Sequence, residues 1–155
     1  MAKNRIHLYN AASSRAIDND ATAPIAQGGL GITGYDLMTR AAAYALASFC
    51  ERWPDAPGFS LFCGKGNNAG DGYVMAQMAK QLGLDVQIFA AVDPSLLTGD
   101  AHRAYHECLA NGLLIEDLGA PIRHLIIVDA LLGTGFYPPV REDIASAISH
   151  INAHT

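Results

Sequence analysis

The sequence contains little charge, and few of its charged residues are cations. Only 16% of its 155 residues are charged, and just three residues are lysines. Ten Lys and Arg residues against fifteen Asp and Glu residues give a net charge of -5 with His neutral. Proteins that bind nucleic acid or lie on a membrane surface need clustered Lys and Arg, which this sequence does not have. We therefore expect no nucleic-acid partner and no membrane partner.

Cysteines and long apolar runs are also scarce. Cys50, Cys63 and Cys108 are odd in number, lie far apart and form no C-x-x-C pair, which argues against a disulfide framework or a zinc site. No apolar run approaches the ~18 residues of a membrane span, and the first residues lack the apolar core of a secretory signal. Half of the residues are hydrophobic, so the chain can build a core. These features favour a cytoplasmic protein with a single domain over residues 1–155.

Helical and strand patterns alternate along the chain. A capping box at Thr33 and Asp36 predicts a helix that ends before Pro54. Apolar spacing predicts further helices over residues 8–20, 73–82, 98–111 and 141–154. Short apolar runs predict strands over residues 59–63, 84–91, 113–118 and 124–130. This order implies an α/β fold of three layers, with a mostly parallel sheet and two N-terminal helices.

Strand order tells where a ligand would bind. In open parallel sheets, ligands bind at the carboxyl ends of the strands where the strand order reverses. If the first strand is central and the chain winds outward before it returns, the first and fourth strands are neighbours. The loops Gly64–Gly72 and Asp129–Pro139 would then flank one crevice.

The first loop, GKGNNAGDG, is rich in glycine and carries two amides and a carboxylate. Its four glycines permit positive φ angles and a close approach of a ligand to the backbone. Free N–H groups at the start of the following helix would bind an anion or a polar oxygen. Asp71 would repel a phosphate, so it is a candidate to meet a ligand hydroxyl or a cation. Capping of the helix by Asp71 is the alternative, and the two roles are compatible.

The second loop begins with Asp129, at the end of a strand predicted to be buried, where a carboxylate needs a partner. If Asp129 faces the amide oxygens of Asn67 or Asn68, the oxygens form a site suited to a hard, univalent cation. The alternative is that Asp129 caps the turn that follows it. Gly133, Thr134 and Gly135 add backbone donors and one hydroxyl.

Three segments carry a resemblance to a known family. Cys63–Gly72 resembles the G-x-G-N-N-G-G-D-G loop of the NAD(P)H-hydrate epimerases, the YjeF-type N-terminal domain. Val128–Phe136 is similar to the D-A-L-F/L-G-T-G segment of that family, and Leu37–Ala42 to its L-M-E-x-A-G helix. The resemblance extends over essentially the whole chain.

The resemblance implies a Rossmann-like fold and a function in nicotinamide nucleotide repair. The family is an isomerase family that interconverts the R and S epimers of hydrated NADH and NADPH. The resemblance further implies a bound potassium ion and a homodimer. It also implies an ADP-dependent dehydratase that is either fused to this domain or separate from it.

The site residues implied by the resemblance fall in the two loops. The first substrate-binding loop corresponds to Asn67, Asn68, Ala69, Gly70 and Asp71, and the second to Gly133, Thr134, Gly135 and Phe136. The potassium ligands correspond to Asn68 and Asp129. Asp71 and Asp129 are also the candidates for catalysis, because they are the carboxylates of the crevice.

The chain departs from the family pattern in three places. Ala69 stands where the family has Gly, so its φ must be negative, and Thr39 and Ala42 replace the usual Glu and Gly. The sequence ends at Thr155, before the V-D-x-P-S-G segment that supplies another substrate-contacting Asp and a potassium-binding Ser. We therefore expect an incomplete domain with poor epimerase activity by itself. A non-catalytic nucleotide- or metabolite-binding module of the same fold is the alternative function.

Overall fold

The computed structural model describes residues 9–154. The helices are α1 (Ala11–Thr22), η1 (Ile25–Gln27), α2 (Gly34–Arg52), α3 (Asn67–Gln81), η2 (Pro94–Leu96), α4 (Gly99–Ala110) and α5 (Glu142–Asn152), where η marks 3-10 helices. The strands are β1 (Gly58–Cys63), β2 (Asp85–Ala90), β3 (Ile115–Glu116) and β4 (Ile127–Ala130). The predicted alternation of strands and helices is confirmed.

The four strands form one parallel sheet in the order β3-β2-β1-β4. Leu61 of β1 lies between Ile88 of β2 and Val128 of β4. The first strand is therefore central, and the fourth is its neighbour, as the sequence predicts. The carboxyl ends of β1 and β4 meet where the strand order reverses, which is the expected place for a ligand.

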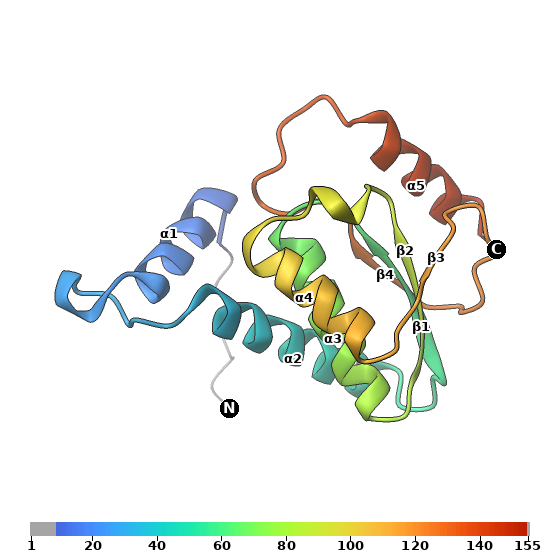
Figure 1. Ribbon diagram of the computed structural model, residues 1–155, viewed down its shortest axis with the longest axis horizontal. Coiled ribbons are helices and arrows are strands. Elements are labelled where there is room, and N and C mark those ends of the chain that lie inside the picture. The colour runs from blue at the N-terminus through green and yellow to red at the C-terminus, as the bar shows by residue number, and fades with distance from the viewer. Residues whose placement is uncertain (1–8, 155) are drawn as a thin grey trace, which may run out of the picture.

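Helices cover both faces of the sheet, so the three-layer α/β/α architecture is confirmed. Helices α2, α3 and α4 lie on one face, and α5 lies on the other (Figure 1). Every residue of β1 is buried, because β1 has the strands β2 and β4 on its two sides and helices on both faces. On the α5 face, the rings of Phe62 and Phe89 stack with centroids 4.5 Å apart, and Ile144 and Ala147 pack against them.

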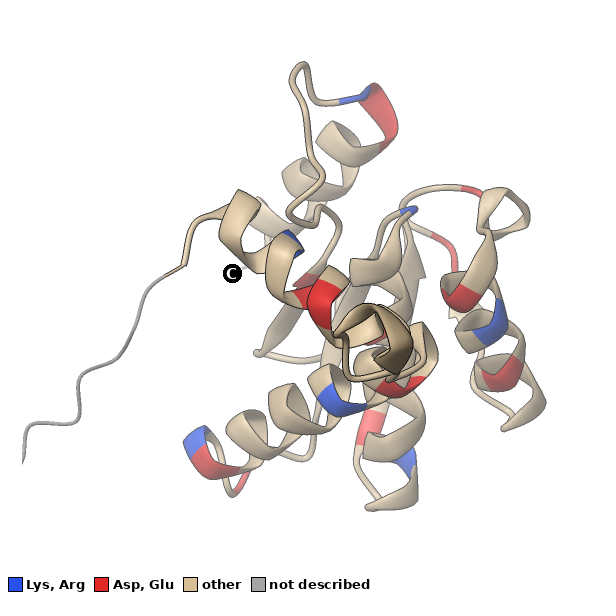
Figure 2. Cartoon of the chain, turned by 90° about the vertical axis from the view of Figure 1, so that its left-hand side faces the viewer, with Lys and Arg blue, Asp and Glu red and all other residues tan. Residues whose placement is uncertain are grey.

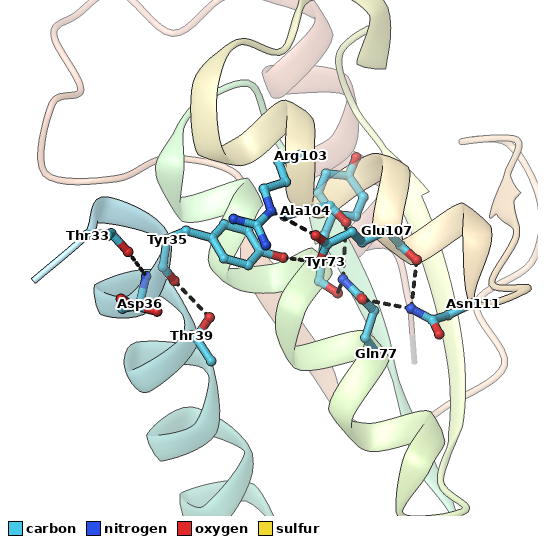
Figure 3. Close-up of polar contacts among 10 residues, drawn as sticks. All are labelled: Thr33, Tyr35, Asp36, Thr39, Tyr73, Gln77, Arg103, Ala104, Glu107 and Asn111. Carbon is cyan, nitrogen blue, oxygen red and sulfur yellow. Dashed lines mark hydrogen bonds and ion pairs between the residues drawn. The ribbon is translucent and has the colours of Figure 1, made fainter.

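Polar side chains join the three helices that share one face (Figure 3). The Tyr35 hydroxyl of α2 donates a hydrogen bond to Glu107 of α4, and the Arg103 guanidinium lies 3.7 Å from the centre of the Tyr35 ring. Between α3 and α4, the Gln77 amide donates to the backbone oxygen of Ala104 at 3.1 Å. These contacts fix α3, whose first turn forms part of the site described below.

Two predicted helix ends are confirmed in atomic detail. The Thr33 side chain accepts a hydrogen bond from the Asp36 N–H at 3.0 Å, and α2 ends at Arg52, before Pro54. Helix α4 is followed by Gly112 with a φ of 72°, a conformation that favours glycine.

Other predicted boundaries were wrong. Helix α1 begins at Ala11, because the Asn10 side chain caps it by accepting the Ser13 N–H at 2.8 Å; residue 8 lies outside the described residues. Helix α3 begins at Asn67 rather than residue 73, so most of the glycine-rich loop is helical. Strands β3 and β4 are shorter than predicted, and β4 is half-buried rather than buried. The reason is its place at the edge of the sheet, where β1 is its only strand neighbour within residues 9–154.

Charged residues are spread over the helices, with acidic and basic segments interspersed (Figure 2). Among the described residues, no helix combines the length and the apolar character that a membrane crossing requires.

Candidate functional site

A pocket of about 770 Å³ lies at the carboxyl ends of β1 and β4. The two predicted loops both line it, through residues 65–68 and Asp71 on one side and residues 131–136 on the other. The predicted crevice is therefore present. Segments that the sequence did not place at the crevice also contribute, namely α1, the turn after β2 and the start of α5. Their residues in the lining are Arg15, Asp18, Asn19, Val92, Arg141 and Ile144.

The glycines of the first loop serve close packing rather than unusual backbone angles. None of the four has a positive φ, contrary to the conformational role proposed from the sequence. A Cβ atom on Gly70 would lie 2.5 Å from the Cε atom of Met38 and 3.0 Å from the Cα atom of Ala101. A Cβ atom on Gly64 would overlap the backbone oxygen of Leu131. These glycines let α2, α4 and the second loop approach the start of α3.

Ala69 and Gly70 do not line the pocket, although the family resemblance placed them in the substrate loop. Both are buried on the inner side of α3, where they pack against the core. The expectation of a negative φ at Ala69 is confirmed, since no non-glycine residue among the described residues has a positive φ. Asn67, Asn68 and Asp71 of the same helix do line the pocket, because they lie on the side opposite to Ala69 and Gly70.

Of the two carboxylates that line the pocket, Asp71 is the less exposed, since Asp18 is open to solvent. Asp71 lies in the second turn of α3, is half-buried, and accepts no side-chain hydrogen bond from residues 9–154. Helix α3 has no side-chain cap, so the alternative in which Asp71 caps it is not observed. Burial raises the pKa of Asp71 to about 6, and the negative charge of Asp18 adds to the shift. A group with this pKa can both donate and accept a proton near neutral pH.

The second loop is exposed and is tied to the rest of the site by hydrogen bonds. The Asn68 amide nitrogen donates to the backbone oxygen of Leu132 at 3.2 Å. The Arg15 guanidinium donates to the backbone oxygen of Thr134 at 2.5 Å. Within the loop, the Phe136 N–H donates to the Gly133 oxygen at 3.0 Å. The loop therefore presents Phe136, which is 43% exposed, at the mouth of the pocket.

Asp129 lies differently from the prediction. It is exposed rather than buried, and one of its carboxylate oxygens accepts the Leu131 N–H at 2.9 Å, so Asp129 caps its own turn. It does not line the pocket. Its second oxygen and the amide oxygen of Asn68 are of the kind that a univalent cation binds. Within residues 9–154, no group of three or more His, Cys, Asp or Glu could hold a metal, so a cation here would need neutral oxygens in addition to the Asp129 carboxylate.

A second groove, of about 650 Å³, runs between α2 and the free edge of β4. Its lining is mainly apolar and includes Phe49, Trp53, Ile127 and Val128. We place the candidate site in the first pocket, because that pocket lies at the carboxyl ends of the strands and contains the carboxylate with a raised pKa.

Sequence reasoning missed the contribution of α1 to the pocket. Arg15, Asp18 and Asn19 follow the i, i+3, i+4 spacing of one helix face, which is a signal that they point the same way. No feature of the sequence indicates what that face lies against.

Known proteins are similar to this chain in sequence and in fold. A bifunctional NAD(P)H-hydrate repair enzyme of Coxiella burnetii is 40% identical over 124 residues, which cover 79% of this chain and 25% of the relative. An NAD(P)H-hydrate epimerase of Legionella pneumophila is 33% identical over 132 residues, which cover 77% of this chain and 48% of the relative. The chain thus spans between a quarter and a half of the length of these relatives.

A crystal structure of the yeast protein ynu0 has the same fold. It superposes with a TM-score of 0.80 at 24% identity, over 96% of this chain and 68% of the yeast chain. The family model described as YjeF-related protein N-terminus matches residues 34–155, which is most of the chain. The chain belongs to the family of YjeF-related protein N-termini.

Proposed function

We propose that this protein interconverts the R and S epimers of hydrated NADH and NADPH, as part of nicotinamide nucleotide repair. The observation that carries the proposal is the pocket between the start of α3 and the Gly133–Phe136 loop, with Asp71 half-buried on its wall. The names of the curated relatives support the same activity and favour it over a non-catalytic binding module.

The chemistry needs an acid. Epimerisation at the hydrated ring carbon can proceed by reversible loss of the hydroxyl group. In this route Asp71 donates its proton to the hydroxyl oxygen, the C–O bond breaks, and water leaves with the bonding electrons. Water then adds to the other face of the ring and returns a proton to the Asp71 carboxylate. A pKa of about 6 suits a group that must be reprotonated in each cycle.

Binding of the nucleotide would use the rest of the pocket. Lys65, Arg15 and Arg141 supply positive charge in the pocket that Asp18 and Asp71 also line. The free N–H groups at the start of α3 would bind an anion. Phe136 offers an exposed ring at the mouth of the pocket. These groups match a substrate that combines phosphates with flat rings.

Potassium remains part of the proposal. The amide oxygen of Asn68 and the second oxygen of Asp129 would hold the ion, which would place positive charge beside the first loop. The test is thermal unfolding in potassium chloride and in sodium chloride at equal ionic strength. A higher melting temperature in potassium, lost in Asp129→Asn, would support the ion; equal melting temperatures would contradict it.

The dimer, the dehydratase partner and weak activity of the 155 residues by themselves stay predictions. The last is tested by comparing the epimerisation rate of this chain with that of a longer chain carrying a V-D-x-P-S-G segment. A lower rate in this chain is expected, and equal rates would contradict it.

Calorimetry with hydrated and ordinary NADH tests the proposed substrate. We expect hydrated NADH to bind more tightly, because Asp71 can hydrogen-bond to its extra hydroxyl group. Asp71→Ala should weaken binding of hydrated NADH by about 1.5–3 kcal/mol, as for a hydrogen bond to a charged group. Asp20→Ala, which removes an exposed carboxylate outside the pocket, is the control and should bind like the wild type. Equal affinity of Asp71→Ala and the wild type would contradict the proposal.

A further inference from the structure

Helix α1 lies outside the part of the chain that the family model matches, which begins at residue 34. It nevertheless contributes Arg15, Asp18 and Asn19 to the pocket wall. These residues occupy one face of the helix, so α1 faces the two loops as a third wall of the site.

The N-terminal part of α1 has little packing to hold it in this place. The only residue of α1 that is buried is Ala21, at the other end of the helix. At that end, the backbone oxygens of Asp20 and Ala21 accept the N–H groups of Leu30 and Ile32, at 3.2 and 3.0 Å. A further attachment is the Arg15 side chain, which donates to the Thr134 backbone oxygen, 119 residues away in sequence, at 2.5 Å. Among residues 9–154, this is the one side-chain hydrogen bond that links α1 to the second loop.

Asp18 stands in the same pocket as Asp71, one on each wall. A negative charge in the same pocket disfavours ionisation of a neighbouring carboxyl group, so ionised Asp18 favours the protonated form of Asp71. Three cations also line this pocket and oppose that effect: Arg15 from α1, Lys65 from the first loop and Arg141 from the start of α5. Arg141 is itself paired with Asp143 at 2.7 Å. The negative charge of Asp18 contributes to the raised pKa of Asp71 in the presence of these groups.

We infer that α1 is a working part of the site: Arg15 is a positioning residue that holds the second loop across the pocket, and Asp18 is a positioning residue that keeps a proton on Asp71. The effect on turnover rests on the proposed epimerase function. The effects on the loop and on Asp71 are properties of the free protein.

Hydrogen exchange tests the role of Arg15 without a substrate. Arg15→Ala should speed exchange of the amides of residues 131–136, whereas Arg40→Ala, which removes an exposed arginine of α2, should not. Arg15→Lys, which keeps one donor, should fall between Arg15→Ala and the wild type. Equal exchange in Arg15→Ala and Arg40→Ala would overturn the role of Arg15. In the epimerase assay, Arg15→Ala should raise KM at least about tenfold, the loss expected for one charge-assisted hydrogen bond.

Titration of the Asp71 carboxyl carbon by NMR tests the role of Asp18. Asp18→Asn should lower the midpoint of that titration below the value in the wild type. Asp20→Asn makes the same change of charge on α1 outside the pocket and should leave the midpoint in place. An unchanged midpoint in Asp18→Asn, or an equal shift in Asp20→Asn, would overturn the inference. In the assay, Asp18→Asn should move the alkaline limb of kcat to lower pH with little change in KM. If the protein proves to have no epimerase activity, the exchange and titration results still decide this inference.

Discussion

The amide of Asn68 and the backbone oxygen of Leu132 are joined by a hydrogen bond of 3.2 Å that links the two loops of the pocket. Asn68 stands in the first turn of α3, while Leu132 follows the turn that Asp129 caps. This bond fixes the distance between the two walls that a ligand would contact.

Asn68→Ala should lower the free energy of unfolding by about 0.5–1.5 kcal/mol, the usual net worth of one hydrogen bond. Asn67→Ala is the matched control, since Asn67 is exposed and makes no side-chain hydrogen bond within the described residues. It should cost less than about 0.5 kcal/mol. Urea denaturation measures both, and equal losses would show that the bond between the loops contributes nothing.

Gly70→Ala should destabilise the protein because the new methyl group would meet Met38 and the backbone of Ala101. Overpacking of this kind costs about 1–3 kcal/mol. The same change at Gly135, which has open space around its Cβ position, should stay within about 0.5 kcal/mol. Thermal unfolding measures the stability of the two variants relative to the wild type. If Gly70→Ala is as stable as Gly135→Ala, the packing role of this glycine is refuted.

The location of the site could be predicted from the sequence, but its composition could not be predicted fully. Strand order and the two glycine-containing motifs point to one crevice, because parallel strands bring their carboxyl ends together. The start of α3 was missed because Asn and Gly have low helix propensity, and packing against α2 and α4 overrides it. The exposure of Asp129 was missed because the run HLIIVDA does not reveal that β4 lies at an edge. The contribution of α1 to the pocket was missed because the spacing of apolar residues indicates a helix but not the elements that the helix lies against.

The raised pKa of Asp71 predicts a pH-dependent stability. The folded state holds the proton more tightly than the unfolded state, so this group favours folding at low pH, and that contribution is lost as the pH rises from about 4 to about 6. Asp71→Asn should therefore raise stability at pH 7.5, by about 1 kcal/mol once partial exposure to solvent is taken into account. At pH 3.5 the variant and the wild type should have the same stability. A variant that is less stable than the wild type at pH 7.5 would contradict the raised pKa.

Tyr73 should tolerate the loss of its hydroxyl group. The side chain is fully buried, and its hydroxyl oxygen has no hydrogen-bond partner among the described residues. Removal of an unsatisfied buried polar group is neutral or favourable, so Tyr73→Phe should leave the melting temperature unchanged or raise it. Tyr35→Phe makes the same chemical change but removes the hydrogen bond to Glu107, and should cost about 0.5–1.5 kcal/mol. A larger loss in Tyr73→Phe than in Tyr35→Phe would mean that Tyr73 has a partner in solution.

The most direct test of the account follows the conversion of R to S hydrated NADH by chromatography, with wild type, Asp71→Asn and Asp20→Asn. The wild type should speed equilibration above the spontaneous rate, though less than a longer chain that carries a V-D-x-P-S-G segment, and Asp20→Asn should match the wild type. Asp71→Asn should lose at least about a hundredfold in rate, because general acid–base catalysis contributes about 10²–10⁴-fold. No acceleration by the wild type, or full activity in Asp71→Asn, would contradict the account.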